Sequence, residues 1–176
     1  MEEFRFLDEK LLEFRKYQME DKGSIIWAAE KGRNSALVYP TSGGKTFTAF
    51  MVIDHFLPKG KIVFYAHTNY LCEQHLRDLR TFFKIPSTEI NKITGKVTAK
   101  KRLEHWQNSR IIVATPQTIK TMLENGLIDY SEVAYNVFDE MHMADKKYAY
   151  VYLANKCNEL NIRLLGLTAS TGKKEK

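Results

Sequence analysis

Residues 36–56 of this 176-residue chain, ALVYPTSGGKTFTAFMVIDHF, are the most informative segment about its fold. A short apolar run leads into a loop with two adjacent glycines, and the loop leads into an apolar segment of helical character. Glycines let backbone N–H groups wrap closely around an anion, and the helix that follows adds the positive end of its dipole. In this setting Lys45 can reach the β- and γ-phosphates of a nucleotide, and the Thr46 hydroxyl can ligate Mg²⁺. The stretch therefore predicts a phosphate-binding loop between a strand and a helix.

This loop departs from the full phosphate-loop pattern, G-x-x-x-x-G-K-[ST], at one position. The pattern requires a first glycine where this chain has Tyr39. A glycine-rich turn that merely ends a strand is the simpler alternative. The Gly-Lys-Thr core between a strand and a helix favours nucleotide binding instead. The residues expected to surround the phosphates are Thr41, Ser42, Gly43, Gly44, Lys45 and Thr46.

Similar apolar runs recur along the chain and alternate with helical patterns. The runs are nearly continuous rather than alternating, which is typical of strands buried on both faces of a parallel sheet. They cover residues 36–39, 62–66, 111–114, 133–138 and 162–167. Helices are expected over 14–30, over 47–56, from Asn69, over 100–107 and after Pro116. The pattern predicts an α/β fold, a mostly parallel, doubly wound sheet with helices on both faces.

In such sheets ligands bind at the carboxyl ends of the strands. Asp139 and Glu140 directly follow the run at 133–138, so both carboxylates are expected at that edge. Asp139 is placed to hold Mg²⁺ opposite Thr46, and Glu140 to polarise an attacking water as general base. Alone, an Asp-Glu pair at this position is most often a solvated strand end. Its combination with the upstream Gly-Lys-Thr core favours catalysis.

Seven segments resemble, in order and spacing, the motifs of superfamily 2 helicases. Asp139-Glu140-Met141-His142 resembles their DExH box, and residues 40–46 resemble motif I. The others are Arg15-Lys16-Tyr17-Gln18, residues 66–74, Thr94-Gly95, residues 114–118 and Leu167-Thr168-Ala169-Ser170. The resemblance covers nearly the whole chain. It implies a RecA-like P-loop domain that uses ATP and Mg²⁺ and acts on nucleic acid.

Within that superfamily the chain is most similar to the Hef/FANCM group. The similarity lies in Thr94-Gly95, Lys101-Arg102, Trp106, residues 112–117 and Tyr148-Ala149-Tyr150-Val151. RIG-I-like and Dicer helicases share much of the pattern from Thr94 to residue 117 and less of the Tyr148–Val151 segment. Met141 replaces the usual Ala or Cys, and Met143 stands where the group commonly has Arg. Neither residue is a metal ligand or the general base, so the predicted chemistry is unaffected. The departures concern the coupling between the DExH box and the neighbouring motifs.

The resemblance also assigns roles to individual residues. Arg15 would stack on adenine and Gln18 would pair with its edge, although each could be an ordinary helix residue. His142 would couple the box to Thr168 or Ser170. The predicted phosphate contacts of the nucleic-acid strand are Thr68, Thr94, Gly95 and Thr115, with strand-end capping as the alternative. The basic run at 96–102 is equally explained as a strand contact or as a solvated helix face, and Trp106 is expected in the core.

Composition sets wider limits. The net charge of +6, from 27 Lys plus Arg against 21 Asp plus Glu, permits nucleic-acid binding without demonstrating it. Apolar runs are too short for a membrane span, so no membrane partner is expected. Cys72 and Cys157 lie far apart without a CxxC pair, which excludes a disulfide framework and a zinc finger. An intracellular location, cytoplasmic or nuclear (nucleoid), is therefore expected.

We expect a lead-in over residues 1–34, a RecA-like ATP-binding domain over 35–171 and a tail over 172–176. The superfamily has a second RecA-like domain that supplies arginine fingers, and no arginine follows Arg163 here. Such a chain is expected to hydrolyse ATP weakly or not at all by itself. The predicted function is ATP hydrolysis coupled to movement on, or remodelling of, DNA, with branched DNA as the favoured substrate. The alternatives are a double-stranded-RNA-dependent ATPase of the RIG-I-like or Dicer type and a P-loop ATPase that is not a helicase.

Overall fold

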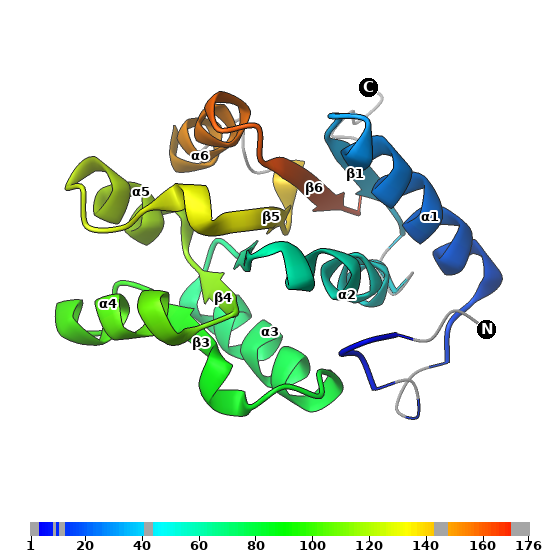
Figure 1. Ribbon diagram of the computed structural model, residues 1–176, viewed down its shortest axis with the longest axis horizontal. Helices are drawn as coiled ribbons and strands as arrows, with labels where there is room; N and C mark the ends of the chain where they lie inside the picture. The colour runs from blue at the N-terminus through cyan, green and yellow to red at the C-terminus, as the bar shows by residue number, and fades with distance from the viewer. Residues whose placement is uncertain (1–3, 9, 11–12, 41–43, 143–147, 170–176) are drawn as a thin grey trace, which may run out of the picture.

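The computed structural model describes residues 4–8, 10, 13–40, 44–142 and 148–169. Its centre is one parallel sheet with the strand order β1-β6-β5-β2-β4-β3. The strands are β1 (Ser35–Val38), β2 (Lys61–Tyr65), β3 (Ile90–Ile93), β4 (Ile111–Ala114), β5 (Val133–Phe138) and β6 (Arg163–Thr168). Figure 1 shows them side by side. Because all neighbours run parallel, their carboxyl ends meet at one edge.

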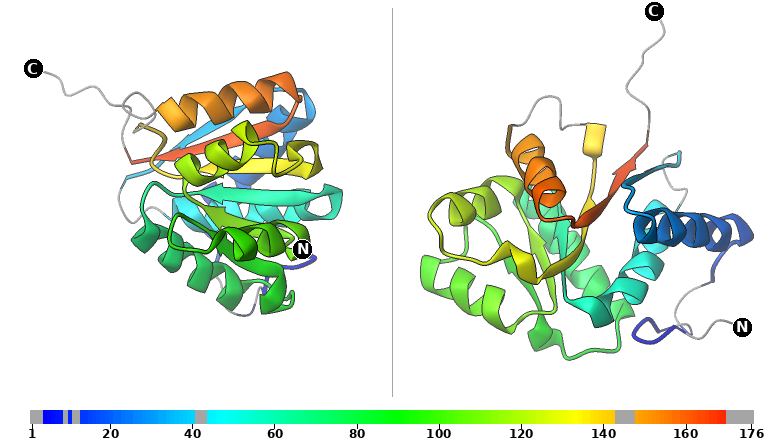
Figure 2. Two further views of the ribbon diagram at one scale, coloured as in Figure 1. Left: turned by 90° about the vertical axis from the view of Figure 1, so that its left-hand side faces the viewer. Right: turned by 45° about the horizontal axis from the view of Figure 1, so that its top comes forward.

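Helices cover both faces of this sheet (Figure 2). One face packs against α1 (Lys16–Glu30), α2 (Lys45–Phe56) and α3 (Asn69–Phe82), and the other against α4 (Ala99–Asn108), α5 (Pro116–Glu124) and α6 (Tyr148–Glu159). On β2, Ile62 and Phe64 belong to the first core, whereas Val63 and Tyr65 belong to the second. This alternation is why the run is apolar without interruption. The predicted parallel α/β sheet with helices on both faces is confirmed.

The five predicted strands are present, each shifted by at most one residue. Strand β3 and helix α6 were not among the predicted elements. The middle of β3 is polar, because Asn91 donates to the Ser109 hydroxyl (2.9 Å) and Lys92 pairs with Glu73 on α3. An edge strand with polar residues at its centre lacks the continuous apolar run of its neighbours.

The segment before α1 packs against the same core as the sheet. The buried Asp54 carboxylate on α2 accepts the backbone N–H groups of Arg5 (3.0 Å), Phe6 (2.6 Å) and Leu7 (2.8 Å). Leu7 also pairs with Phe83, just beyond α3, in an isolated antiparallel bridge. These contacts attach residues 5–7 to α2 and to the end of α3. In the part of the chain that is described, no helix is long and apolar enough to cross a bilayer.

Candidate nucleotide and nucleic-acid site

The predicted functional segments lie along one edge of the sheet, in two adjacent halves. The phosphate loop follows β1, Thr168 ends β6 and Asp139 follows β5; these three strands are neighbours. Thr68, Thr115 and Thr94 follow β2, β4 and β3, which are also neighbours. We call these the nucleotide half and the nucleic-acid half. They meet between β5 and β2.

Gly44 joins the proposed phosphate loop to α2 in a left-handed conformation that favours glycine. Its φ is 76°, and a Cβ there would lie 2.4 Å from Nε2 of Gln18. Its carbonyl accepts the N–H groups of Phe47 (3.1 Å) and Thr48 (3.2 Å). Lys45 and Thr46 consequently form the first turn of α2, at the positive end of the helix dipole. Thr41, Ser42 and Gly43 lie outside the described residues.

Gln18 connects α1 to the phosphate loop. The side chain is buried; its Oε1 accepts the Arg15 N–H (2.8 Å), and its Nε2 donates to the Gly44 carbonyl (3.1 Å). An amide has two donors and two acceptor lone pairs, so among the described residues one donor and one lone pair of Gln18 are without a partner. Arg15 is exposed, and its Nη1 donates to the Tyr17 hydroxyl (3.0 Å). The contacts of Arg15 and Gln18 with adenine stay predictions.

Tyr39 shows what replaces the first glycine of the loop pattern. Its hydroxyl donates to Asp21 on α1 (2.5 Å), and its ring meets the Tyr17 ring edge-on, with centroids 5.3 Å apart. Burial, followed by the hydrogen bond to the Asp21 carboxylate, raises the pKa of Tyr39 to about 12. The phenol therefore stays protonated as a donor. A glycine at this position could not tie α1 to the end of β1.

Asp139 is held from several sides at the end of β5. Its N–H donates to the Tyr65 carbonyl (2.9 Å), and its own carbonyl accepts the Tyr150 hydroxyl (2.9 Å). Its Oδ1 accepts the Glu140 N–H (3.0 Å), and its Oδ2 lies 2.8 Å from Nε2 of His75. Carboxylate oxygens are the ligands that Mg²⁺ prefers, so this donor fits the predicted metal. His75 was not among the predicted site residues.

Glu140 adopts a left-handed backbone conformation, with φ of 52°. A non-glycine residue there costs about 1–3 kcal/mol, and such residues cluster at functional sites. The Glu140 side chain is half-buried, and its Oε2 lies 3.3 Å from Nε2 of His142. Nδ1 of His142 is 3.0 Å from the Thr168 hydroxyl on β6. The expected contact between His142 and Thr168 is thus present; its role in coupling stays a prediction. Ser170 lies outside the described residues.

Met141, the unusual residue of the Asp-Glu-Met-His segment, packs against Gly166 on β6. A Cβ at position 166 would lie 1.9 Å from Sδ of Met141 and 3.1 Å from its Cγ. The absence of a side chain at Gly166 therefore makes room for the larger residue at 141. Met143 lies outside the described residues.

Gly166→Ala is expected to lower the free energy of unfolding by about 1–3 kcal/mol, because it overpacks this contact. The double variant Met141→Ala/Gly166→Ala should recover most of the loss. Urea denaturation measures both. As a control, Gly23→Ala on α1 should not destabilise, since a Cβ there meets no atom within 4 Å and alanine favours helix. Equal losses in the single and double variants would contradict this pairing.

In the nucleic-acid half, the predicted contacts differ in accessibility. Thr68 is exposed, and its hydroxyl accepts the Leu71 N–H (3.2 Å) at the start of α3. Thr115 is half-buried, with its hydroxyl 2.8 Å from that of Thr118. Thr94 is only 1% exposed, and its hydroxyl donates to Oδ1 of Asn69 (3.0 Å). The Thr94 hydroxyl thus has a partner within the domain, and its contact with a phosphate stays a prediction. The exposed Gly95 beside it can still offer its backbone.

The basic run divides into two kinds of residue. Arg102 packs on the loop around Gly95, since its Nε donates to the Val97 carbonyl (2.7 Å) and its Nη2 to the Gly95 carbonyl (3.5 Å). Lys100 and Lys101 are exposed on α4. Arg102 therefore supports the loop. Lys100 pairs with Glu104 one turn later on α4 (4.0 Å), and both lysines are exposed to solvent. Trp106 is buried in the core, as predicted.

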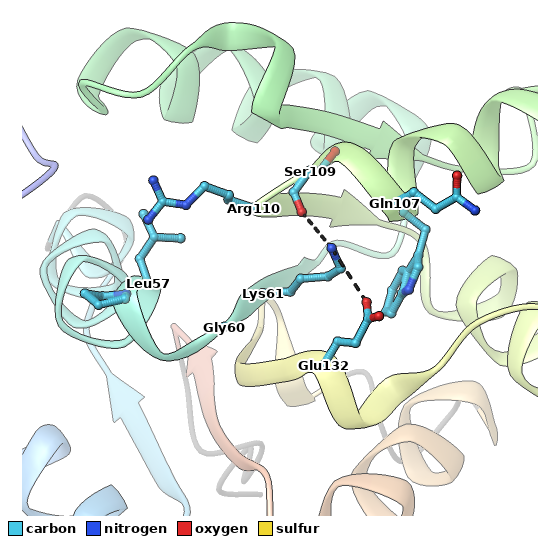
Figure 3. A pocket seen from close by; sticks show the side chains of 9 residues that line it. Leu57, Gly60, Lys61, Gln107, Ser109, Arg110 and Glu132 are labelled. Atoms are coloured by element: carbon cyan, nitrogen blue, oxygen red, sulfur yellow. Dashed lines mark hydrogen bonds and ion pairs between the residues drawn. The ribbon is translucent and has the colours of Figure 1, made fainter.

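Two hollows lie at opposite edges of the sheet. One of about 320 Å³ adjoins the nucleic-acid half, between His67, Thr115 and Tyr148. The other, of about 520 Å³, lies near the amino ends of β2 and β4 (Figure 3). In it Lys61 donates to the Ser109 carbonyl (3.1 Å) and pairs with Glu132 (3.7 Å). These partners neutralise Lys61, and the hollow is remote from the carboxyl edge, so it is not part of the candidate site.

Comparison with known proteins places this geometry in a family. Residues 20–176 match the DEAD/DEAH box helicase family. A Methanocaldococcus jannaschii protein with the provisional name ATP-dependent RNA helicase is 36% identical over 93% of this chain. The ATP-dependent DNA helicase fml1 of Schizosaccharomyces pombe is 31% identical over 92%. The DEAD-box ATP-dependent DNA helicase Fancm of Drosophila melanogaster is 34% identical, also over 92%.

A solved structure agrees with these relatives. The crystal structure of the Pyrococcus furiosus Hef helicase domain superposes with a TM-score of 0.89 and 34% identity over 97% of this chain. The similarity confirms the predicted RecA-like fold and the likeness to the Hef/FANCM group. The chain spans 36% of that Hef chain, and 20%, 19% and 11% of the three relatives in the order named.

Proposed function

Because the chain belongs to the DEAD/DEAH box helicase family, we propose that it is an ATP-binding motor domain whose hydrolysis of ATP drives movement on, or remodelling of, DNA. One observation carries this proposal. The nucleotide half and the nucleic-acid half lie side by side on a single sheet edge, and they meet between the neighbouring strands β5 and β2. A change at the phosphates can therefore reach strand contacts through directly packed elements.

In the proposed nucleotide site, Lys45 and the N-terminal amides of α2 bind the phosphates, together with the loop residues 41–44. Arg15 and Gln18 contact adenine. Thr46 and Asp139 would hold Mg²⁺, whose charge would neutralise the phosphate oxygens when bound. Glu140 accepts a proton from the attacking water, and His142 and Thr168 hold Glu140 against β6.

The proposed partner within the same protein is a second RecA-like domain. The relatives are several times longer than this chain, which leaves ample length for such a domain. In the superfamily that the sequence resembles, the second domain supplies the arginines that stabilise charge on the transferred phosphoryl group. An arginine finger is worth about 10³–10⁵ in rate. We therefore propose that this chain alone hydrolyses ATP slowly or not at all.

DNA is the proposed nucleic acid, and branched DNA the preferred form. Two relatives named above are called DNA helicases, and the segments shared with the Hef/FANCM group support the same choice. The Methanocaldococcus protein is named for RNA, which keeps double-stranded RNA as the rival. Threonine hydroxyls and backbone groups reach phosphates rather than base edges, so binding should not depend on sequence.

The test is a titration of ATPase rate in the full-length protein that carries this domain. Single-stranded, duplex and forked ligands are compared, each as DNA and as RNA. Forked DNA is expected to stimulate hydrolysis most, at lower concentrations than matched RNA, with equal responses to unrelated sequences. Stronger stimulation by double-stranded RNA would favour the rival. An ATPase rate that stays the same with every nucleic acid tested would contradict the proposed motor function.

A further inference from the structure

His75 is a buried histidine at the boundary between the two halves of the carboxyl edge. It lies on α3, two turns after Thr68, with its ring centroid 4.5 Å from that of Phe64 on β2. Its Nε2 reaches Oδ2 of Asp139 at 2.8 Å, although 64 residues separate the two in sequence. Both side chains are about 95% buried. The helix that begins in the nucleic-acid half thus contacts the candidate metal ligand in the nucleotide half.

The direction of this hydrogen bond follows from its partners. A carboxylate can only accept, so Nε2 of His75 carries the proton and donates. Nδ1 of the same ring is buried and has no hydrogen-bond partner among the described residues. Leaving a buried polar atom unpaired costs free energy, and a leucine in this position would avoid that cost. Packing against Phe64 therefore does not account for a histidine here, whereas the bond to Asp139 does.

On the basis of the function proposed above, we propose that His75 is a positioning residue for the metal ligand Asp139. A carboxylate group rotates broadly about its last bond unless it is held. In Asp139, Oδ1 accepts the Glu140 N–H and Oδ2 accepts from His75, so the carboxylate plane is fixed from both sides. Each oxygen keeps a lone pair for the cation. Groups that hydrogen-bond a metal ligand typically change metal affinity or activity by about 10–100-fold when they are removed.

The test measures Mg²⁺ directly through nucleotide binding, without turnover. A fluorescent, non-hydrolysable ATP analogue is bound to the protein, first in EDTA and then at increasing Mg²⁺. His75→Leu is expected to raise the half-saturating Mg²⁺ concentration about 10-fold or more, while affinity in EDTA stays at the wild-type value. His75→Gln has a side-chain amide that can still donate to Asp139, so this variant should keep most of the Mg²⁺ response that His75→Leu loses.

A matched pair keeps the test valid if the leucine variant does not fold. His75→Asn has the same amide as His75→Gln but is one methylene too short to reach Oδ2, so it should behave like His75→Leu. His105→Leu is the control, because its ring bonds only the Lys92 carbonyl among the described residues (2.8 Å) and touches no metal ligand. Thermal unfolding of each variant separates lost stability from lost Mg²⁺ affinity.

The outcomes distinguish this inference from the function on which it rests. Asp139→Ala should lose the Mg²⁺ response more completely than any His75 variant. If Asp139→Ala loses the response and folded His75→Leu and His75→Asn keep it, the positioning role is overturned and the metal site stands. If Asp139→Ala also keeps the response, the proposed metal site itself is wrong.

Discussion

Glu140→Gln is expected to slow nucleic-acid-stimulated ATP hydrolysis by about 10²–10⁴-fold, while ATP still binds with nearly wild-type affinity. Glutamine keeps the size and hydrogen-bonding capacity of the side chain, but it cannot accept the proton of the attacking water. The half-buried position of Glu140 and its 3.3 Å contact with His142 suit a base held at one place. Single-turnover hydrolysis in the full-length protein, beside equilibrium binding of ATP, separates the chemical step from binding.

Glu159→Gln is the matched control, because Glu159 lies at the end of α6, where it pairs with Lys156 at the surface (3.0 Å). That variant should hydrolyse ATP at the wild-type rate. Turnover near the wild-type rate in Glu140→Gln would remove Glu140 from the mechanism. A parallel loss of ATP affinity would instead assign it to nucleotide binding.

Lys45→Ala is expected to weaken ATP binding by at least about 30-fold while the fold survives. Removing one member of a close charge pair costs about 2 kcal/mol or more, which corresponds to that change in affinity. Lys45 is the first residue of α2, so we propose that its ammonium and the helix amides bind the same phosphates. Binding of a fluorescent ATP analogue measures the loss, and circular dichroism with thermal unfolding confirms the fold.

Lys59→Ala provides the control for this variant. Lys59 lies just beyond the other end of α2, 3.9 Å from Glu30, so it carries the same charge at the opposite side of the domain. Its replacement should leave ATP affinity unchanged. Wild-type affinity in a folded Lys45→Ala protein would contradict the proposed nucleotide site.

The sequence alone does not show which side chains at the sheet edge are already hydrogen-bonded within the domain. A Thr-Gly pair after a strand suggests that the Thr94 hydroxyl faces a phosphate, yet this hydroxyl bonds Asn69, 25 residues away. Strand β3 was not predicted for a similar reason. Its centre, Asn91-Lys92, is polar, and it is satisfied by Ser109 and by Glu73, which come from other elements. No pattern in a short window of sequence can show such partners.

The parallel α/β fold and the place of the Asp-Glu pair directly after β5 could be predicted from the sequence, as could the position of the proposed phosphate loop between β1 and α2. These features depend on residues close together in the chain: apolar runs that alternate with helical patterns, glycines at a turn, and acids that directly follow a strand. The contacts of Tyr39 with α1, of Met141 with Gly166 and of His75 with Asp139 became visible only once the helices were packed on the sheet. The physical reason is that each of these contacts joins residues from different elements, and the distance between them is set by how helices pack on the sheet rather than by their separation in sequence.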